Sequence, residues 1–205
     1  MKHRSANRAV FERYITEAEE RQLLQCIAGT SGVLAARDHA WMRLLRQTGL
    51  RVETLALLSV RDAREALANG RLVLRPEICK GGKGYDVRVN KAAAAALRDL
   101  LRIRREMDAP ADLDAPLIMS QKSRGMSIRS FQDRMQHWCQ AAGLKIEASP
   151  HWWRHTLAQR ILARSESTDP IGIVQVALGH RTRHATAIYT LPNREEVDRA
   201  IDGAC

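Results

Sequence analysis

The residues best suited to chemistry gather toward the C-terminal end of the chain. His151 and Arg154 lie three positions apart, His180 closes a Leu-Gly-His triplet, and Tyr189 follows nine residues later. A guanidinium stays protonated and offers forked donors to phosphate oxygens, and an imidazole exchanges protons near neutral pH. A tyrosine hydroxyl has a pKa near ~10, so it needs a base or a positive pocket to act as a nucleophile. These residue types suit chemistry on a phosphate.

Local signals predict a helix that carries the first two of these residues. Ser149 is a typical N-cap and Pro150 a typical first helical residue. His151 and Arg154 would then share one face of the helix, because residues three apart are neighbours on its surface. Another face, which looks like core, carries Trp153, Leu157 and Ile161.

A second, shorter helix is predicted to place His180. Asp169-Pro170 is a typical opening, and Gly179 is a typical residue just past the end of a helix. His180 would therefore lie at that helix end, with Tyr189 one short segment further on. His155, four residues after His151, fits a structural or supporting role at the helix end.

Two segments nearer the N-terminus carry further cationic residues. Thr48-Gly49-Leu50 interrupts a helical pattern and leaves Arg51 at the start of the next helix. Lys80 and Lys83 lie in a glycine-rich turn between short strands predicted at residues 72–74 and 87–89. The phosphate-loop pattern G-x-x-x-x-G-K-[ST] is absent, which excludes that nucleotide site. Taken alone, Arg51 is typical of an exposed arginine and the lysines of a basic turn.

Composition points to a polyanionic partner. The chain has 205 residues, 33 Lys and Arg against 23 Asp and Glu, a net charge of +10 and a pI of about 10.1. Such a balance is typical of nucleic-acid binding. The sequence has no secretory signal and no apolar run approaching the roughly 20 residues of a membrane span. Four scattered cysteines without a C-x-x-C pair indicate a reducing compartment, so we expect a cytoplasmic protein.

The five motifs, in this order, resemble those of the tyrosine recombinase (phage integrase) family. They are Thr48-Gly49-Leu50-Arg51, the turn Lys80-Gly81-Gly82-Lys83-Gly84, His151-Trp152-Trp153-Arg154, Leu178-Gly179-His180 and Tyr189. The resemblance runs from about Tyr14 to Ala200. It implies a mainly α-helical catalytic domain with a small antiparallel β-sheet (α+β), and a site-specific DNA recombinase or integrase.

The resemblance also implies a mechanism that needs neither metal, cofactor nor ATP. Tyr189 would attack a DNA phosphodiester to form a 3′-phosphotyrosine and release a 5′-hydroxyl. Arg51 and Arg154 would bind the phosphate, and Lys80 would protonate the leaving oxygen. His151 would accept the tyrosine proton, and His180 would bind the phosphate or orient Tyr189.

One departure from the family concerns the surroundings of Arg51. Relatives usually carry an acidic residue three positions after this arginine, but here that position is Thr54, with Glu53 beside it. Support of Arg51 by a carboxylate is therefore an open question, and Glu53 could face either way.

The domain organisation expected from the resemblance is simple. We expect a flexible basic arm over residues 1–13 and a catalytic domain over 14–205 that includes a C-terminal helix at 193–202. Arg51 comes too early for an N-terminal core-binding domain, as in the short recombinases similar to fimbrial phase-switch invertases. An excised fragment of a longer integrase would look the same. Double-stranded DNA is the expected partner, with a dimer or tetramer formed through the C-terminal helix and room for accessory DNA-bending proteins. Candidate DNA contacts are Lys83, Lys122, Arg124 and Arg129.

Two alternative functions share the same residues. A type IB topoisomerase would relax DNA by the same tyrosine chemistry, and a non-catalytic DNA-binding regulator could keep the fold. Zinc on His151 and His155 is disfavoured, because no glutamate follows His151 and no third ligand is evident. Tyr14 and Tyr85 are disfavoured as nucleophiles, because neither follows a Leu-Gly-His triplet.

Overall fold

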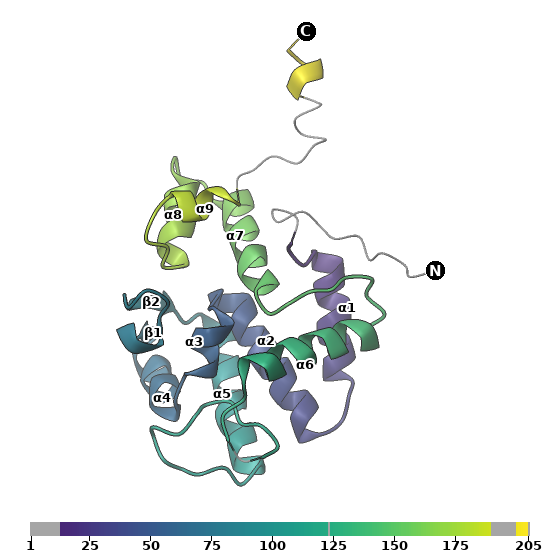
Figure 1. The fold of residues 1–205 in the computed structure, drawn as a ribbon, viewed down its shortest axis with the longest axis vertical. Helices are drawn as coiled ribbons and strands as arrows, with labels where there is room; N and C mark the ends of the chain where they lie inside the picture. The colour runs from purple at the N-terminus through teal and green to yellow at the C-terminus, as the bar shows by residue number, and fades with distance from the viewer. Residues whose placement is uncertain (1–12, 123, 190–199, 205) are drawn as a thin grey trace.

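The structure, a computed structural model, describes residues 13–122, 124–189 and 200–204 and is mainly helical (Figure 1). This confirms the expected α+β class with a small antiparallel sheet. The elements are α1 (Glu17–Ala28), α2 (Val33–Thr48), α3 (Val52–Ala56), α4 (Val60–Asn69), β1 (Arg71–Leu74), β2 (Tyr85–Arg88), α5 (Lys91–Glu106), α6 (Ile128–Ala141), α7 (Trp152–Arg164), α8 (Pro170–Ala177) and α9 (His184–Ala187).

Helix ends follow the local sequence closely. A capping box between Thr16 and Glu19 begins α1, because each side chain satisfies a backbone N–H of the other's residue. Gly49 ends α2 in the left-handed region at φ 59°, where glycine avoids the steric cost of a side chain. That sharp end turns the chain directly into Arg51, the N-cap of α3.

The sheet is one antiparallel hairpin. Leu72 pairs with Val87 and Leu74 with Tyr85, so the second strand begins two residues before the predicted Val87. Gly81 and Gly82 both adopt positive φ in the connecting turn, at 84° and 64°. A two-stranded hairpin is marginal by itself, so its position depends on what it packs against.

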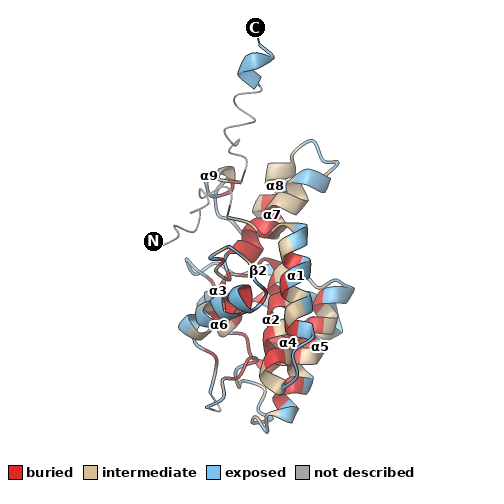
Figure 2. Ribbon diagram, turned by 90° about the vertical axis from the view of Figure 1, so that its right-hand side faces the viewer, coloured by how far each residue is buried: buried red, intermediate tan, exposed pale blue. Residues whose placement is uncertain are grey.

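The buried hydrophobic side chains form two clusters, and Figure 2 shows the buried residues in red. The larger cluster joins α1–α6 and the first turn of α7, with Trp41 and Phe131 packed edge to face at 5.2 Å and 88°. In the described part of the chain, the buried members of the smaller cluster are Ala158, Val174, Leu178 and Tyr189, which join α7, α8 and the residues after α9. Figure 1 shows α8 and α9 beside α7, at one end of the molecule.

A fully buried carboxylate ties α2 to α6 inside the larger cluster. Asp38 accepts hydrogen bonds from the indole N–H of Trp41 at 3.0 Å and of Trp138 at 2.9 Å. Arg37 and Arg134 both form ion pairs with it. A buried charge is tolerated when it is paired and fully hydrogen-bonded, so Asp38 fixes the angle between these two helices.

Helix α7 starts later than predicted. Ser149 does not cap it; the N-cap is His151, and no side-chain cap bond is present. The turn before the helix closes instead through the Ser149 and Pro150 carbonyls, which accept from the N–H groups of Trp152 and Trp153. His151 nevertheless has helical backbone angles, and its carbonyl accepts from Arg154, so the two residues remain one turn apart.

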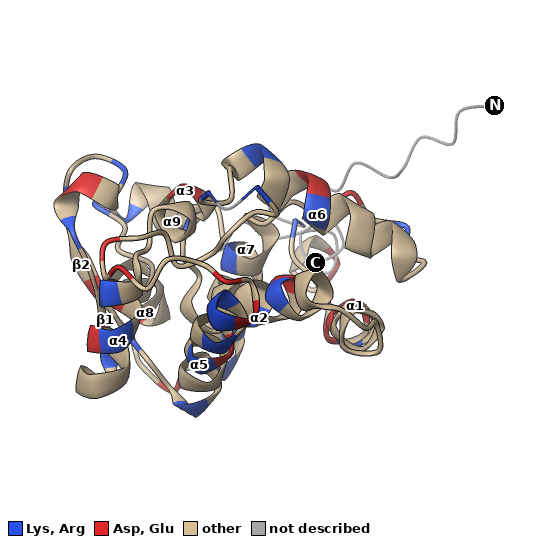
Figure 3. Cartoon of the chain, turned by 90° about the horizontal axis from the view of Figure 1, so that it is seen from below, with Lys and Arg blue, Asp and Glu red and all other residues tan. Residues whose placement is uncertain are grey.

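The expected arm at residues 1–13 and the expected helix at 193–202 lie almost wholly outside the described residues. No helix in the described ranges is long and apolar enough to cross a bilayer. Figure 3 shows Lys and Arg on α2, α4, α5, α6 and the hairpin, with acidic residues among them, so the positive charge is spread over many elements.

Candidate active site

Arg154 lies at the centre of the candidate site, and its side chain is 1% exposed. Its guanidinium donates to the Gly49 carbonyl at 2.7 Å and to the Leu178 carbonyl at 2.6 Å. The first carbonyl ends α2 and the second ends α8. Arg154 therefore holds together two of the predicted motifs as well as presenting positive charge.

Gly49 permits this close approach. A Cβ atom at that position would lie 2.7 Å from Leu178 and 2.9 Å from Leu157, distances that side chains essentially never adopt. The glycine that ends α2 thus also lets the larger cluster touch the smaller one. Helix α7 runs between the two and contributes Leu157 to the contact.

Arg51 is half-buried at the start of α3. Its positive charge acts on His151, His180 and Tyr189, as does that of Arg154. In the part of the chain that the structure describes, no ion pair includes either arginine. No carboxylate among the described residues therefore neutralises either guanidinium.

Thr54 and Glu53 have separate environments. Thr54 is buried, and its hydroxyl donates to the Ile78 carbonyl at 3.0 Å. Glu53 is exposed, and its negative charge acts on His151. Thr54 therefore anchors the segment that leads to Lys80, while the carboxylate beside it faces the site entrance.

Lys80 is exposed in the hairpin turn, two residues after that anchored carbonyl. Its charge is close enough to contribute to lowering the pKa of His151. Lys83 is also exposed, further along the same turn. The structure thus brings Lys80 to the site and leaves Lys83 at the turn.

His151 lies at the entrance to the site. Loss of solvent around its ring lowers its pKa first, and the charges of Arg154 and Arg51 lower it further. The residue still keeps exposed surface. A neutral imidazole at pH 7 can accept a proton, which is the state that a general base requires.

His180 faces Tyr189 from the loop after α8. The two rings are stacked with centroids 5.9 Å apart and an interplanar angle of 11°. Nδ1 of His180 shares a 2.8 Å hydrogen bond with the Thr186 hydroxyl, which leaves Nε2 for another partner. Burial, followed by the charges of Arg154 and Arg51, lowers the pKa of His180 to about 4, so the ring is neutral at pH 7.

Tyr189 is 4% exposed and belongs to the smaller cluster. Burial raises the pKa of its hydroxyl, whereas Arg154, within hydrogen-bonding range, lowers it. Gln159 of α7 donates to the Tyr189 carbonyl at 3.1 Å. Tyr189 is therefore held inward, beside the Arg154 guanidinium.

His155 lies closer to the candidate catalytic residues than its position in the sequence, four residues after His151, indicated. Its ring lies edge-on to His151, with centroids 4.9 Å apart, and edge-on to Tyr189 at 5.0 Å. The residue is buried, Nδ1 has no hydrogen-bond partner among the described residues, and burial lowers its pKa to about 4. Only its position one residue after Arg154 could have indicated this contact. Within the described ranges, no group of three metal-ligating residues occurs.

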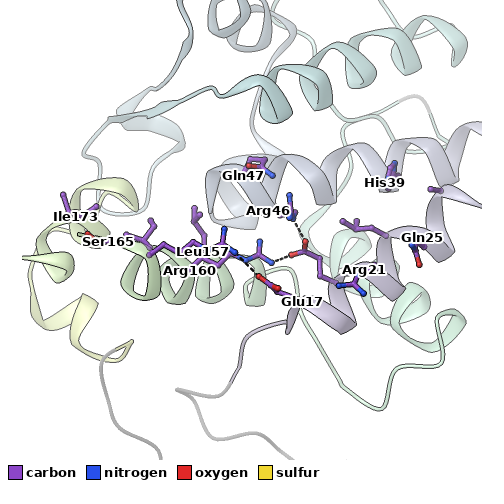
Figure 4. Close-up of a pocket in the computed structure, with 15 residues that line it drawn as sticks. Glu17, Arg21, Gln25, His39, Arg46, Gln47, Leu157, Arg160, Ser165 and Ile173 are labelled. Carbon is purple, nitrogen blue, oxygen red and sulfur yellow. Dashed lines mark hydrogen bonds and ion pairs between the residues drawn. The ribbon is translucent and has the colours of Figure 1, made fainter. Parts of the chain in front are cut away.

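The remaining predicted DNA contacts lie elsewhere. Lys122 and Arg124 line a pocket of about 360 Å³ beside Ser127, the N-cap of α6. Arg129 is exposed and pairs with Asp133 at 2.9 Å. None of the six predicted catalytic residues lines a larger cleft of about 1000 Å³, which lies between α1, α2, α7 and α8 (Figure 4).

Known proteins resemble this chain in sequence. The phage integrase family matches residues 13–196. A tyrosine recombinase XerC of Shewanella amazonensis is 37% identical over 171 residues, which are 83% of this chain and 54% of that protein. The chain spans about half the length of the curated relatives it matches.

Solved structures share the fold. The crystal structure of XerA recombinase aligns with a TM-score of 0.72 at 24% identity, covering 93% of this chain and 63% of that one. XerH site-specific recombinase, bound to its difH substrate in a pre-cleavage complex, aligns with a TM-score of 0.67 at 22% identity, covering 92% and 53%. At such identities the likeness establishes the fold alone, and it is the fold that the motifs predicted.

Proposed function

Because the chain belongs to the phage integrase family of tyrosine recombinases, we propose that it is the catalytic part of a site-specific DNA recombinase. It would cleave and rejoin DNA through a 3′-phosphotyrosine formed by Tyr189. The observation that carries this proposal is the position of the Tyr189 hydroxyl, which lies beside the buried Arg154 guanidinium while His180 stacks on the phenol ring.

The proposed reaction exchanges one phosphoester for another. The Tyr189 oxygen bonds to phosphorus as the bond to the 5′ oxygen breaks, His151 takes the phenol proton, and Lys80 gives a proton to the departing oxygen. Arg51 and Arg154 stabilise the charge that builds on the non-bridging oxygens. Attack by a 5′-hydroxyl reverses each transfer, so the step needs no ATP.

DNA contacts outside the centre would use the exposed cations. We assign Lys83, Lys122 and Arg124 to the phosphate backbone, since the last two flank the start of α6, where backbone N–H groups favour anions. Arg129 contributes less because Asp133 already pairs with it. Replacing Lys122 by Ala is expected to reduce the salt dependence of binding by about one unit of slope, measured by fluorescence anisotropy at several salt concentrations.

Assembly on DNA would use the apolar side of α8. Ile173 is 47% exposed and Val176 is 77% exposed, and Ile173 also lines the large cleft in Figure 4. A C-terminal helix with Val197, Ala200 and Ile201 on one side, contributed by a second copy, fits such a surface. Val176→Asp should reduce cooperative assembly in gel-shift experiments, while Val73→Asp on β1, at a position 61% exposed, should not.

Covalent trapping tests the function directly. The protein is incubated with supercoiled plasmid carrying the DNA that flanks its own gene, quenched with detergent and assayed for protein bound to 3′ ends, with and without EDTA. We expect an adduct that survives EDTA and disappears in Tyr189→Phe. Retained DNA binding without any adduct would favour the regulator.

Product topology separates the two catalytic hypotheses. A recombinase gives products joined between paired sites, whereas a topoisomerase gives relaxed circles from a plasmid with one site. We further propose a cytoplasmic location at the nucleoid, with accessory DNA-bending proteins as partners, which fractionation and pull-down on the same DNA would test.

A further inference from the structure

We propose that Tyr85 is a positioning residue that docks the hairpin carrying Lys80 onto the Leu-Gly-His loop, so that the lysine stays at the phosphate. The proposal rests on the recombinase function above, and the sequence gives Tyr85 no such role. Its ring lies against Gly179, and its hydroxyl reaches Arg154. Tyr85 thus contacts the loop that presents His180 and the cation at the centre of the site.

The contact with Gly179 is unusually close. A Cβ atom on Gly179 would lie 2.6 Å from two ring carbons of Tyr85 and 2.7 Å from a third. Such distances mean that the ring lies flat on the glycine backbone, and any other residue would force it away. The glycine also adopts φ 62°, so the Leu-Gly-His triplet needs its glycine both for the helix end and for this docking.

The hydroxyl of Tyr85 makes a second contact. It lies within hydrogen-bonding range of the Arg154 guanidinium, whose other donors bind the Gly49 and Leu178 carbonyls. The hairpin, the end of α2 and the end of α8 therefore all meet at one arginine.

Tyr85 and Lys80 lie in the same hairpin, so the docking of Tyr85 also positions Lys80. Tyr85 begins β2 and pairs with Leu74, and its backbone hydrogen-bonds to the thiol of Cys79, which directly precedes Lys80. Arg181, directly after His180, also lies near the turn, since a Cβ atom built on Gly81 would lie 3.5 Å from its guanidinium. Because Lys80 itself is exposed, these contacts determine where its amine lies.

The first test measures docking without any DNA. Hydrogen exchange of the turn amides, such as the Gly82 N–H bonded to the Cys79 carbonyl at 3.1 Å, is compared in the wild type, Tyr85→Ala and Tyr85→Phe. We expect Tyr85→Ala to speed exchange in the turn about tenfold, and Tyr85→Phe, which keeps the ring, to leave it nearly unchanged. Gly179→Ala should resemble Tyr85→Ala because it displaces the same ring. Unchanged exchange in Tyr85→Ala would overturn the proposal even if the chain forms no DNA adduct.

The second test shows whether docking acts through Lys80. Covalent cleavage is timed on an ordinary substrate and on one whose leaving 5′ oxygen is replaced by sulfur. A thiolate departs without a proton, so the sulfur substrate no longer needs the acid. We expect Tyr85→Ala to slow cleavage of the ordinary substrate on the order of 10²-fold, the typical contribution of a general acid.

The sulfur substrate should restore most of that rate, as it should for Lys80→Ala. A loss that sulfur does not restore would overturn the proposal, since it would indicate that Tyr85 acts only through Arg154 or through folding. Loss of the wild-type adduct on both substrates would count against the recombinase function itself, and the exchange experiment would still decide on docking.

Discussion

Two parts of the molecule hold the candidate site, and they differ in how much core supports them. The larger cluster, which carries Arg51 and positions Lys80, is built from six helices and the hairpin. Among the described residues, the smaller cluster, which presents His180 and contains Tyr189, has four buried members, and Tyr189 is the bulkiest of them. Arg51 thus sits on a well-packed body, whereas the candidate nucleophile belongs to a small core.

Contacts around the site form the joint between the two parts, and further along α7 Thr156 accepts from the Ile15 N–H while Arg160 pairs with Glu20. Gly49 meets Leu157 and Leu178, Arg154 bonds to the carbonyls at two helix ends, and Tyr85 lies on Gly179. Local stability varies with the number of buried contacts, so the smaller cluster should open more readily than the larger one. Under the proposed mechanism, such opening would let Tyr189 reach a phosphate.

The largest effect is expected from removing the cation at the joint. Arg154→Ala and Arg51→Ala should each slow adduct formation on the order of 10³-fold, because each removes a donor to the developing charge. Only Arg154→Ala should also lower stability, by about 3 kcal/mol, because it strands two buried carbonyls. Urea unfolding measures the second effect, and equal losses in both variants would refute a structural role for Arg154.

The same truncation in each cluster should have different consequences. Leu44→Ala, at a fully buried site in the larger cluster, should lower the free energy of global unfolding by about 2–5 kcal/mol. Leu178→Ala, equally buried in the smaller cluster, should mainly speed hydrogen exchange over residues 170–189. If both variants shift the global melting transition equally, the two clusters are one cooperative unit and the comparison fails.

Acid should weaken the joint through His155. Burial lowers its pKa from 6.5 to about 4 in the folded chain, so the unfolded chain takes up the proton first. Stability should be complete above about pH 6.5 and fall as the pH drops toward 4, by about 3 kcal/mol at most. Melting temperatures at pH 7 and pH 5 measure this loss.

His155→Gln is the variant for this prediction. It should flatten the pH dependence but leave a residual slope from His180, whose pKa is also lowered to about 4. An unchanged slope would show that His155 does not carry the effect.

The smallest expected effect is the loss of stability caused by a methyl group at Gly49. Gly49→Ala should cost about 1–3 kcal/mol, because its Cβ would press on Leu178 and Leu157 in a tightly packed contact. Gly70→Ala is a matched control, with φ 69° and no atom within 4 Å of its Cβ, so it carries the backbone strain alone. Equal losses of stability would mean that the joint can accommodate a methyl group.

Much of the fold was predictable because its signals are local. The capping box at Thr16, the N-caps at Ser127 and Asp169 and the helix-ending glycines each act within a few residues. The start of α7 was not, since turn bonds from Ser149 and Pro150 replace the expected cap. Strong local signals such as caps and glycines determine where a helix lies. Where two turn geometries compete, the exact end of the helix cannot be predicted from the sequence.

The sequence motifs named the residues of the candidate site, but they did not indicate the contacts that hold those residues in place. The motifs predicted six site residues: Arg51, Lys80, His151, Arg154, His180 and Tyr189. In the structure, the charges of Arg51 and Arg154 act on His151, His180 and Tyr189, so these residues lie near one another. Their roles stay predictions until tested. The contact of Tyr85 with Gly179 joins residues 94 positions apart, and the bond from Thr54 to Ile78 crosses 24. Nothing local in the sequence indicates either.

The arginines at the centre have a consequence for the lifetime of the protein. Two guanidinium groups lie near one another without an ion pair among the described residues. Their charges repel each other, and a bound phosphate would relieve that repulsion. A ligand that binds only the folded state stabilises it by mass action. Molecules seated on DNA would therefore resist unfolding and proteolysis longer than free ones, and cellular abundance would follow the number of available DNA sites.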